Sequence, residues 1–104
     1  MDTLTRLERI IAERRTADPQ ASYVAQLHAG GVPVIARKLG EEAVEGVVAA
    51  LAGEREELVG EAADLIFHLM VLLSAKDIAL GEVLAELDRR EGVSGLDEKA
   101  SRSG

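Results

Sequence analysis

Apolar residues recur along the chain at helical spacing, and no stretch alternates between apolar and polar positions as a strand would. Because residues three or four apart share one face of a helix, these repeats mark helices. They predict helices over about 3–16, 33–53, 54–75 and 79–91. Because helices are predicted and strands are not, we expect an all-α fold. Short connections favour antiparallel neighbours, so we expect an antiparallel bundle of about four main helices, in a single domain over residues 1–104.

The segments between these helices are harder to assign. An Asp-Pro pair ends the first helix, because proline disfavours helical geometry in the residue before it. Residues 17–33 form a connection in which Val24 and Leu27 suggest a short helix. The polar tail, residues 93–104, is predicted to be a loop or only partly ordered.

The two central helices have different apolar patterns. The helix over 33–53 has a single apolar face, made of Val44, Val47, Val48 and Leu51. The helix over 54–75 is apolar nearly all round in its second half, which predicts burial on several sides. A small bundle covers such a surface poorly by itself, so we expect self-association, most simply as a homodimer.

Charge and composition narrow the possible functions. The chain has 104 residues with 19 acids and 12 bases, for a formal charge of −7. A surface that binds nucleic acid needs clustered Lys and Arg, so this class is disfavoured. The absence of Cys excludes disulfides, thiolate nucleophiles and Cys-ligated zinc. The amino-terminal residues lack a signal-peptide pattern, and the apolar run 65–73 is too short for a bilayer, so we expect no membrane partner and a cytoplasmic location.

Carboxylates are placed regularly on the two central helices. Glu42 and Glu45 form one i, i+3 pair, with Glu41 beside them, and Glu61 and Asp64 form another. If the two helices are antiparallel neighbours, both pairs can meet at one point. Converging carboxylates repel unless a cation neutralises them, and oxygen ligands suit Mg²⁺ or Mn²⁺ better than zinc. The pattern therefore predicts a site for a hard divalent cation.

Of two other interpretations of the same residues, one remains open and one is disfavoured. A single Glu-x-x-Glu on a helix is most often a solvated face, and the chain would then be a non-enzymatic helical interaction module. Di-iron chemistry is disfavoured, because His68 follows Asp64 by four residues where a di-iron bundle has Glu-x-x-His.

The spacing of the carboxylates resembles that of a known superfamily. Glu42-x-x-Glu45, fifteen residues, then Glu61-x-x-Asp64 resembles the metal signature of the all-α nucleoside triphosphate pyrophosphohydrolases, the MazG-like enzymes. Within that superfamily the chain is similar to the phosphoribosyl-ATP pyrophosphatases of histidine biosynthesis. The runs that carry this closer similarity are 22–23, 35–45, 53–69 and 95–102.

The resemblance implies an activity and roles for the carboxylates. The reaction is hydrolysis of N1-(5-phosphoribosyl)-ATP to the AMP derivative and pyrophosphate, with Mg²⁺ held by Glu42, Glu45, Glu61 and Asp64. Glu41 and Glu45 are the candidate catalytic residues. Glu41 is placed to orient a water or take its proton, or it is a further ligand. The alternative activity is hydrolysis of ordinary or damaged nucleoside triphosphates.

Substrate-binding candidates lie outside the carboxylate set. Lys38 shares a helix face with Glu42 and can neutralise phosphate charge, or it is only an intrahelical partner of a glutamate. The tail resemblance implies phosphate contacts by Lys99 and Arg102. Tyr23 is a candidate for base or ribose contact, or one more packed aromatic. His68, one turn beyond Asp64, fits a satisfied core histidine better than a group that supports the site.

Overall fold

The computed structural model describes residues 2–92 and 95–103, and this part of the chain contains helices and no strand. Its helices are α1 (Thr3–Arg14), α2 (Tyr23–Gly30), α3 (Val32–Ala52), α4 (Arg55–Ala75), α5 (Leu80–Arg90) and α6 (Gly95–Ser103). The predicted all-α fold class is confirmed, and so are the four main helices and the short helix around Val24. That residues 1–104 form a single domain stays a prediction.

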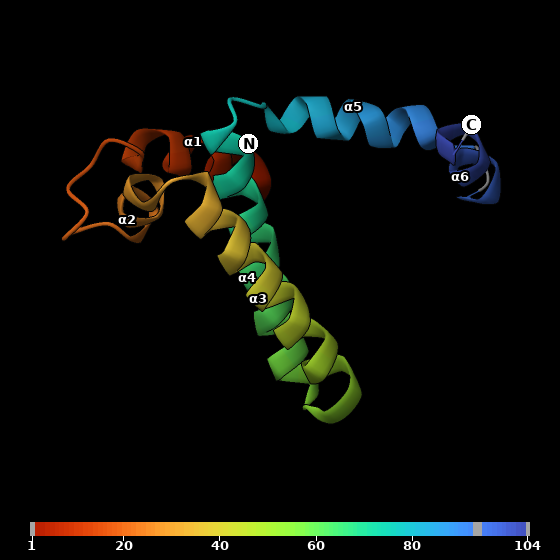
Figure 1. Cartoon of the computed structure of the whole chain (residues 1–104), viewed down its shortest axis with the longest axis horizontal. Helices are drawn as coiled ribbons and strands as arrows, with labels where there is room; N and C mark the ends of the chain where they lie inside the picture. Colours follow the sequence, from red (N-terminus) through yellow and green to blue (C-terminus); the bar gives the residue numbers. More distant parts are fainter. Residues whose placement is uncertain (1, 93–94, 104) are drawn as a thin grey trace.

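The helices are arranged around one long hairpin (Figure 1). α3 and α4 run antiparallel and pack along each other. α1 and α2 lie at the end of the hairpin where α3 begins and α4 ends. α5 leaves that same end and runs away from the hairpin, with α6 at its far end.

The hydrophobic core occupies the end of the hairpin covered by α1 and α2. Its buried residues come from all four of these helices: Ile11, Val24, Leu27, Ile35, Met70 and Val71. Ile35 of α3 and Val71 of α4 are fully buried. This core end therefore fixes how α3 and α4 are rotated about their axes.

The rotation of α3 is the reverse of what its apolar face suggests. In the described chain that face is turned outward, and Val47 and Leu51 are 59% and 83% exposed. At about 100° per residue, Glu42 points within roughly 20° of the direction of Ile35, whereas Val44 points the opposite way. Because Ile35 is anchored in the core, the carboxylate face is turned toward α4 and the valine face toward solvent.

The carboxyl-terminal tail was predicted to be a loop or only partly ordered, and the loop is wrong for the described residues 95–103, whereas partial order stays a prediction. They form α6. The segment contains Leu96, Lys99, Ala100 and Arg102, which are good helix formers, so local propensity favours a helix even in a polar stretch. Residues 93, 94 and 104 of the predicted loop lie outside the described residues.

The corner between α4 and α5 has a defined geometry. α4 ends where Asp77 adopts a left-handed conformation, with φ of 56°. The Ile78 N–H then donates to the Leu73 carbonyl at 2.9 Å, a hydrogen bond typical of a helix C-terminus closed by a left-handed residue.

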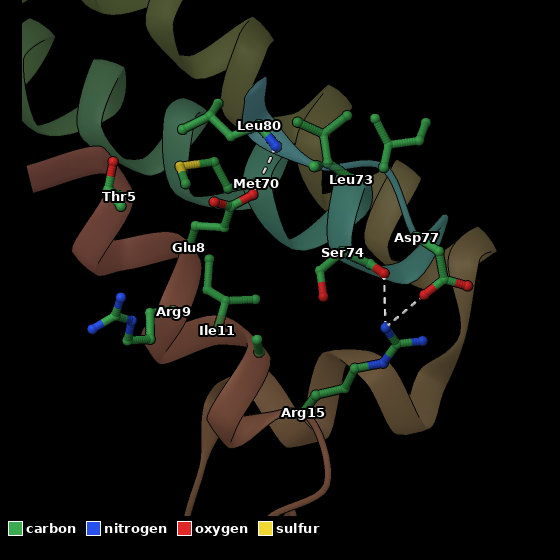
Figure 2. A pocket seen from close by; sticks show the side chains of 13 residues that line it. Thr5, Glu8, Arg9, Ile11, Arg15, Met70, Leu73, Ser74, Asp77 and Leu80 are labelled. Carbon is green, nitrogen blue, oxygen red and sulfur yellow. Dashed lines mark hydrogen bonds and ion pairs between the residues drawn. The ribbon is translucent and has the colours of Figure 1, made fainter. Parts of the chain in front are cut away.

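Two side chains of the first helical segment tie this corner to the core end (Figure 2). Arg15 donates to the Ser74 carbonyl at 2.9 Å and to the Asp77 carboxylate at 3.1 Å. Glu8 accepts a hydrogen bond from the Leu80 N–H at 2.7 Å, at the first residue of α5. A cavity of about 500 Å³ lies between α1 and the corner. These contacts set the direction in which α5 leaves the hairpin.

One described helix, α4, is long and apolar enough to cross a membrane by length and composition alone. It also carries Glu61 and Asp64 and packs along α3, and 17% of its apolar window is buried within the described chain. The burial on several sides that the sequence predicts for its second half is therefore only partial in one chain, where Ile66 and Leu69 are 44% and 40% exposed.

Candidate metal centre

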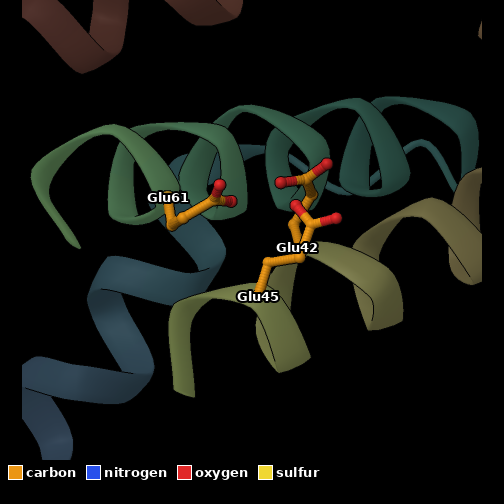
Figure 3. Close-up of side chains that lie close together, drawn as sticks. All are labelled: Glu42, Glu45 and Glu61. Carbon is orange, nitrogen blue, oxygen red and sulfur yellow. The ribbon is translucent and has the colours of Figure 1, made fainter. Parts of the chain in front are cut away.

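Three carboxylates from two helices meet between α3 and α4 (Figure 3). Glu42 and Glu45 stand one turn apart on α3, and Glu61 faces them from α4. One oxygen of each lies within 4.8 Å of the others. α3 lies against α4 here, since a Cβ at Gly46 would be in ordinary van der Waals contact with that of Glu61, at 4.0 Å. The antiparallel packing thus brings both halves of the sequence pattern together.

Two oxygens of this cluster are buried without a hydrogen-bond partner among the described residues. They are Oε2 of Glu42 and Oε2 of Glu61. A buried carboxylate oxygen without a donor is costly unless a cation or a proton compensates it. Their position between three carboxylates indicates a place for positive charge.

The proton affinity of Glu61 is raised by the same crowding. Hydrogen bonding with Glu42, then burial, then repulsion from Glu45 raise the pKa of Glu61 from 4.5 to about 7. The raised pKa favours a proton on Glu61 near neutral pH when no cation is bound. The donor set is oxygen only and carries excess negative charge, so these residues fit a hard divalent cation such as Mg²⁺.

Asp64 lies beside this cluster and does not belong to the three converging oxygens. It is exposed and lines a cavity of about 480 Å³ together with Glu45 and Glu61. The cavity continues along both helices to Gly53, Glu57 and Gly60. The cluster of carboxylates thus opens directly into a space that a ligand can enter, and the role of Asp64 as fourth metal ligand stays a prediction.

Comparison with known proteins identifies the family. The sequence pattern described as phosphoribosyl-ATP pyrophosphohydrolase matches residues 4–91, which include all four candidate metal ligands. The chain belongs to this family.

Named relatives agree with the match over nearly their whole length. A phosphoribosyl-ATP pyrophosphatase of Novosphingobium aromaticivorans is 71% identical over 98% of this chain and 95% of its own. Those of Erythrobacter litoralis and Rhizorhabdus wittichii are 68% and 65% identical, covering 98% and 96% of this chain and 98% and 94% of their own. The family lies in the all-α, MazG-like superfamily, and its members hydrolyse a phosphoanhydride bond. The chain is therefore an enzyme, and the interpretation as a non-enzymatic interaction module is set aside.

Glu41 and Lys38 lie on the flank of the centre. Glu41 is half exposed, and its carboxylate is 3.7 Å from both Arg37 and Lys38. The intrahelical pairing that the sequence allowed for Lys38 is therefore present. Glu41 lies outside the three converging carboxylates, so no contact of the described chain decides between its roles as ligand and as proton acceptor.

Tyr23 and His68 form a connection that sequence reasoning missed. His68 is buried, and its Nε2 lies 2.9 Å from the Tyr23 hydroxyl. Its Nδ1 lies 2.7 Å from the carbonyl of Asp64, so Nδ1 donates this hydrogen bond. The Tyr23 ring also stacks on Phe67 at 6.0 Å. The one available signal was that His68 follows Asp64 by one helical turn.

The two candidate phosphate-binding residues of the tail lie apart from the centre. Lys99 and Arg102 are on α6, beyond the far end of α5 and away from the hairpin (Figure 1). Within one described chain, the fold does not bring them to the carboxylates.

Proposed function

We propose that this enzyme hydrolyses N1-(5-phosphoribosyl)-ATP to N1-(5-phosphoribosyl)-AMP and pyrophosphate, in histidine biosynthesis and with Mg²⁺ as cofactor. Membership of the family supports the substrate, since the similar relatives are named for it. The observation that carries the proposal is the convergence of Glu42, Glu45 and Glu61, with two buried oxygens that lack a partner in the described chain.

The proposed cation is held by these three residues, with Asp64 as the fourth ligand. A bound Mg²⁺ supplies positive charge to phosphate oxygens and lowers the pKa of a coordinated water. The chain is strongly acidic, so a triphosphate approaches the site only if its charge is compensated there. The cavity lined by Glu45, Glu61 and Asp64 is the proposed place of the triphosphate.

The remaining roles in this proposal are to activate the attacking water and to bind the substrate. Glu45 is the catalytic ligand, and Glu41 orients the attacking water or takes its proton. Lys38 neutralises phosphate charge from the flank, and Lys99 and Arg102 bind phosphate oxygens. Tyr23, with 45% of its surface exposed, contacts the base or the ribose.

The proposed form is a cytoplasmic homodimer. Its support is the amount of apolar surface that the described chain leaves uncovered on α3, where Val44, Val47, Val48 and Leu51 are all more than half exposed. A second copy of the chain covers such a face with an identical one across a twofold axis.

The test is pyrophosphate release from phosphoribosyl-ATP beside a panel of ordinary nucleoside triphosphates, with and without Mg²⁺. We expect the wild type to prefer phosphoribosyl-ATP and to need the cation. Glu45→Gln should lose activity by at least about 100-fold, because even changes in residues that only support a metal ligand cost 10–100-fold. Glu56→Gln, on the exposed side of α4, is the matched control and should keep activity.

Two results would overturn this proposal. Equal or faster turnover of ordinary triphosphates would assign the chain to the housekeeping activity instead. Full activity of Glu45→Gln would remove the metal centre from the reaction.

A further inference from the structure

Tyr23 is a surface residue whose backbone, ring and hydroxyl group are all held in place. It begins α2, where Ser22 caps the helix by accepting a hydrogen bond from the Ala25 N–H at 3.3 Å. Its ring stacks on Phe67 of α4, with the ring centres 6.0 Å apart and the planes 18° from parallel. Its hydroxyl lies 2.9 Å from Nε2 of His68. Even so, 45% of Tyr23 is exposed, so an ordered aromatic ring is open to a ligand.

His68 is buried and uses both of its ring nitrogens in hydrogen bonds. Nδ1 donates to the Asp64 carbonyl at 2.7 Å, one turn earlier on α4. In a neutral imidazole a protonated Nδ1 leaves Nε2 as an acceptor, so the Tyr23 hydroxyl donates to it. Because the Asp64 carbonyl belongs to the backbone of α4, the imidazole is fixed to the helix itself. His68 therefore fixes the tip of the Tyr23 side chain relative to α4.

The Tyr23 ring and the cavity beside the carboxylates lie in opposite directions along α4. The cavity extends from Asp64 back to Gly60 and Gly53. His68 follows Asp64 by four residues and Gly60 precedes it by four, so each lies about 6 Å from Asp64 along the helix axis. A nucleotide carries its phosphates and its base at opposite ends. One that enters the cavity with its phosphates can therefore reach the Tyr23 ring with its base.

The composition of the chain concentrates its aromatic rings at this place. It has one tyrosine, one phenylalanine and no tryptophan, and Tyr23 and Phe67 stack on each other. Every base has a π-face that can stack on an aromatic side chain. Because Phe67 and His68 order the Tyr23 ring before a ligand arrives, binding costs less side-chain entropy than it would at a free ring. An exposed, ordered ring next to a centre for a divalent cation therefore suits the base of a nucleotide.

We infer that His68 is a positioning residue, which holds the Tyr23 ring as a stacking surface for the base of the substrate. His68 acts through the Tyr23 hydroxyl and does not itself touch the substrate. The identity of the nucleotide rests on the proposed function, whereas the ordering of Tyr23 by Phe67 and His68 is a property of the fold.

The first test separates the two hydrogen bonds of His68 by substitution. The side-chain amide of Asn reaches the position of Nδ1, and that of Gln reaches the position of Nε2. His68→Asn therefore keeps a donor to Asp64 and loses the acceptor for Tyr23, whereas His68→Gln keeps that acceptor. His68→Asn and Tyr23→Phe should each raise KM for phosphoribosyl-ATP about 3–10-fold, as expected for the loss of one hydrogen bond that supports binding. Their kcat should stay unchanged because the carboxylates are intact, and His68→Gln should keep the wild-type KM.

A double variant and the second histidine serve as controls. Tyr23→Phe/His68→Asn should be no worse than either single variant, because both changes remove the same hydrogen bond. His28→Asn, on the last turn of α2, should leave KM and kcat unchanged. Additive losses in the double variant would overturn the inference, and so would an unchanged KM in His68→Asn. A loss of kcat at unchanged KM would also overturn it, because His68 would then support the carboxylates through Asp64.

The second test uses the wild-type chain, in which Tyr23 is the one tyrosine and there is no tryptophan. Tyrosine emission therefore reports on Tyr23 alone. Titration with phosphoribosyl-AMP and Mg²⁺, corrected for absorption by the ligand, should quench this emission to saturation because the base stacks on the ring. Inorganic pyrophosphate, which has no base, is the control ligand and should leave the emission unchanged.

The outcomes distinguish this inference from the proposed function. Emission that phosphoribosyl-AMP does not quench, in an enzyme that hydrolyses phosphoribosyl-ATP, would overturn the stacking surface alone. Equal quenching by AMP, in an enzyme that prefers ordinary triphosphates, would keep the stacking surface and overturn the proposed substrate alone.

Discussion

The two ends of the α3–α4 hairpin bury opposite kinds of side chain. At the core end Ile35 and Val71 are fully buried beneath α1 and α2. At the other end the inward positions belong to Glu42 and Glu61, while Leu51 is 83% exposed. α3 thus buries apolar residues in its first half and turns half-buried Glu42 toward α4 in its second. We therefore expect the core end to stabilise the fold of a single chain, and the distal end to be stabilised by a bound cation and by a second copy of the chain.

The largest expected effect is a difference in the free energy of unfolding between substitutions at the two ends. Ile35→Ala should lower the free energy of unfolding by about 2–5 kcal/mol, because it leaves a cavity in a fully packed site. Val47→Ala, on the exposed outer face of α3 formed by Val44, Val47, Val48 and Leu51, should cost the isolated chain little. Denaturant unfolding at low protein concentration measures both, and equal losses would contradict the division into two ends.

A smaller effect concerns association through the outer face. Leu51→Ala should weaken the dimer by about tenfold or more, since burying one Leu side chain contributes about 1.5–3 kcal/mol. Sedimentation over a dilution series measures the dissociation constant. Ile10→Ala, at a half-exposed apolar position on α1, is the matched control and should leave that constant unchanged. An unaltered dimer in Leu51→Ala would show that the outer face is not the interface.

The third prediction uses the raised pKa of Glu61, about 7 against 4.5 for an ordinary glutamate. Between these two pH values the folded chain binds more protons than the unfolded chain, so without cation its stability should fall as pH rises through this window and level off above pH 7. A proton on Glu61 competes with Mg²⁺, so the apparent affinity should drop roughly tenfold per pH unit below 7.

Calorimetric titration of Mg²⁺ in buffers of different ionisation enthalpy measures the released proton directly. Glu61→Gln should remove both the proton release and the fall of stability with pH. Proton release that persists in this variant would mean that the released proton comes from another carboxylate.

Much of this arrangement follows from local sequence, and the remainder depends on contacts far apart in the chain. The helices from α1 to α5 were predictable because periodicity and breaking residues act locally, whereas α6 lies in a stretch expected to be a loop or only partly ordered. The meeting of Glu42, Glu45 and Glu61 was predictable because i, i+3 spacing and antiparallel packing suffice for it. The outward rotation of the valine face was not, because it depends on Ile35 docking against α1 and α2. Nor was the hydrogen bond between Tyr23 and His68, which joins residues 45 positions apart.

The smallest expected effect tests whether α5 is coupled to the rest of the molecule. The Ala79 N–H donates to Glu82 at 2.9 Å, which is one half of a capping box, and a Ser at position 79 would add the other half. Ala79→Ser should stabilise α5 by about 1 kcal/mol. Because α5 packs little within its own chain, that gain should appear in unfolding at concentrations where the dimer forms and fade on dilution. A gain that is independent of concentration would mean that α5 is stabilised within its own chain alone.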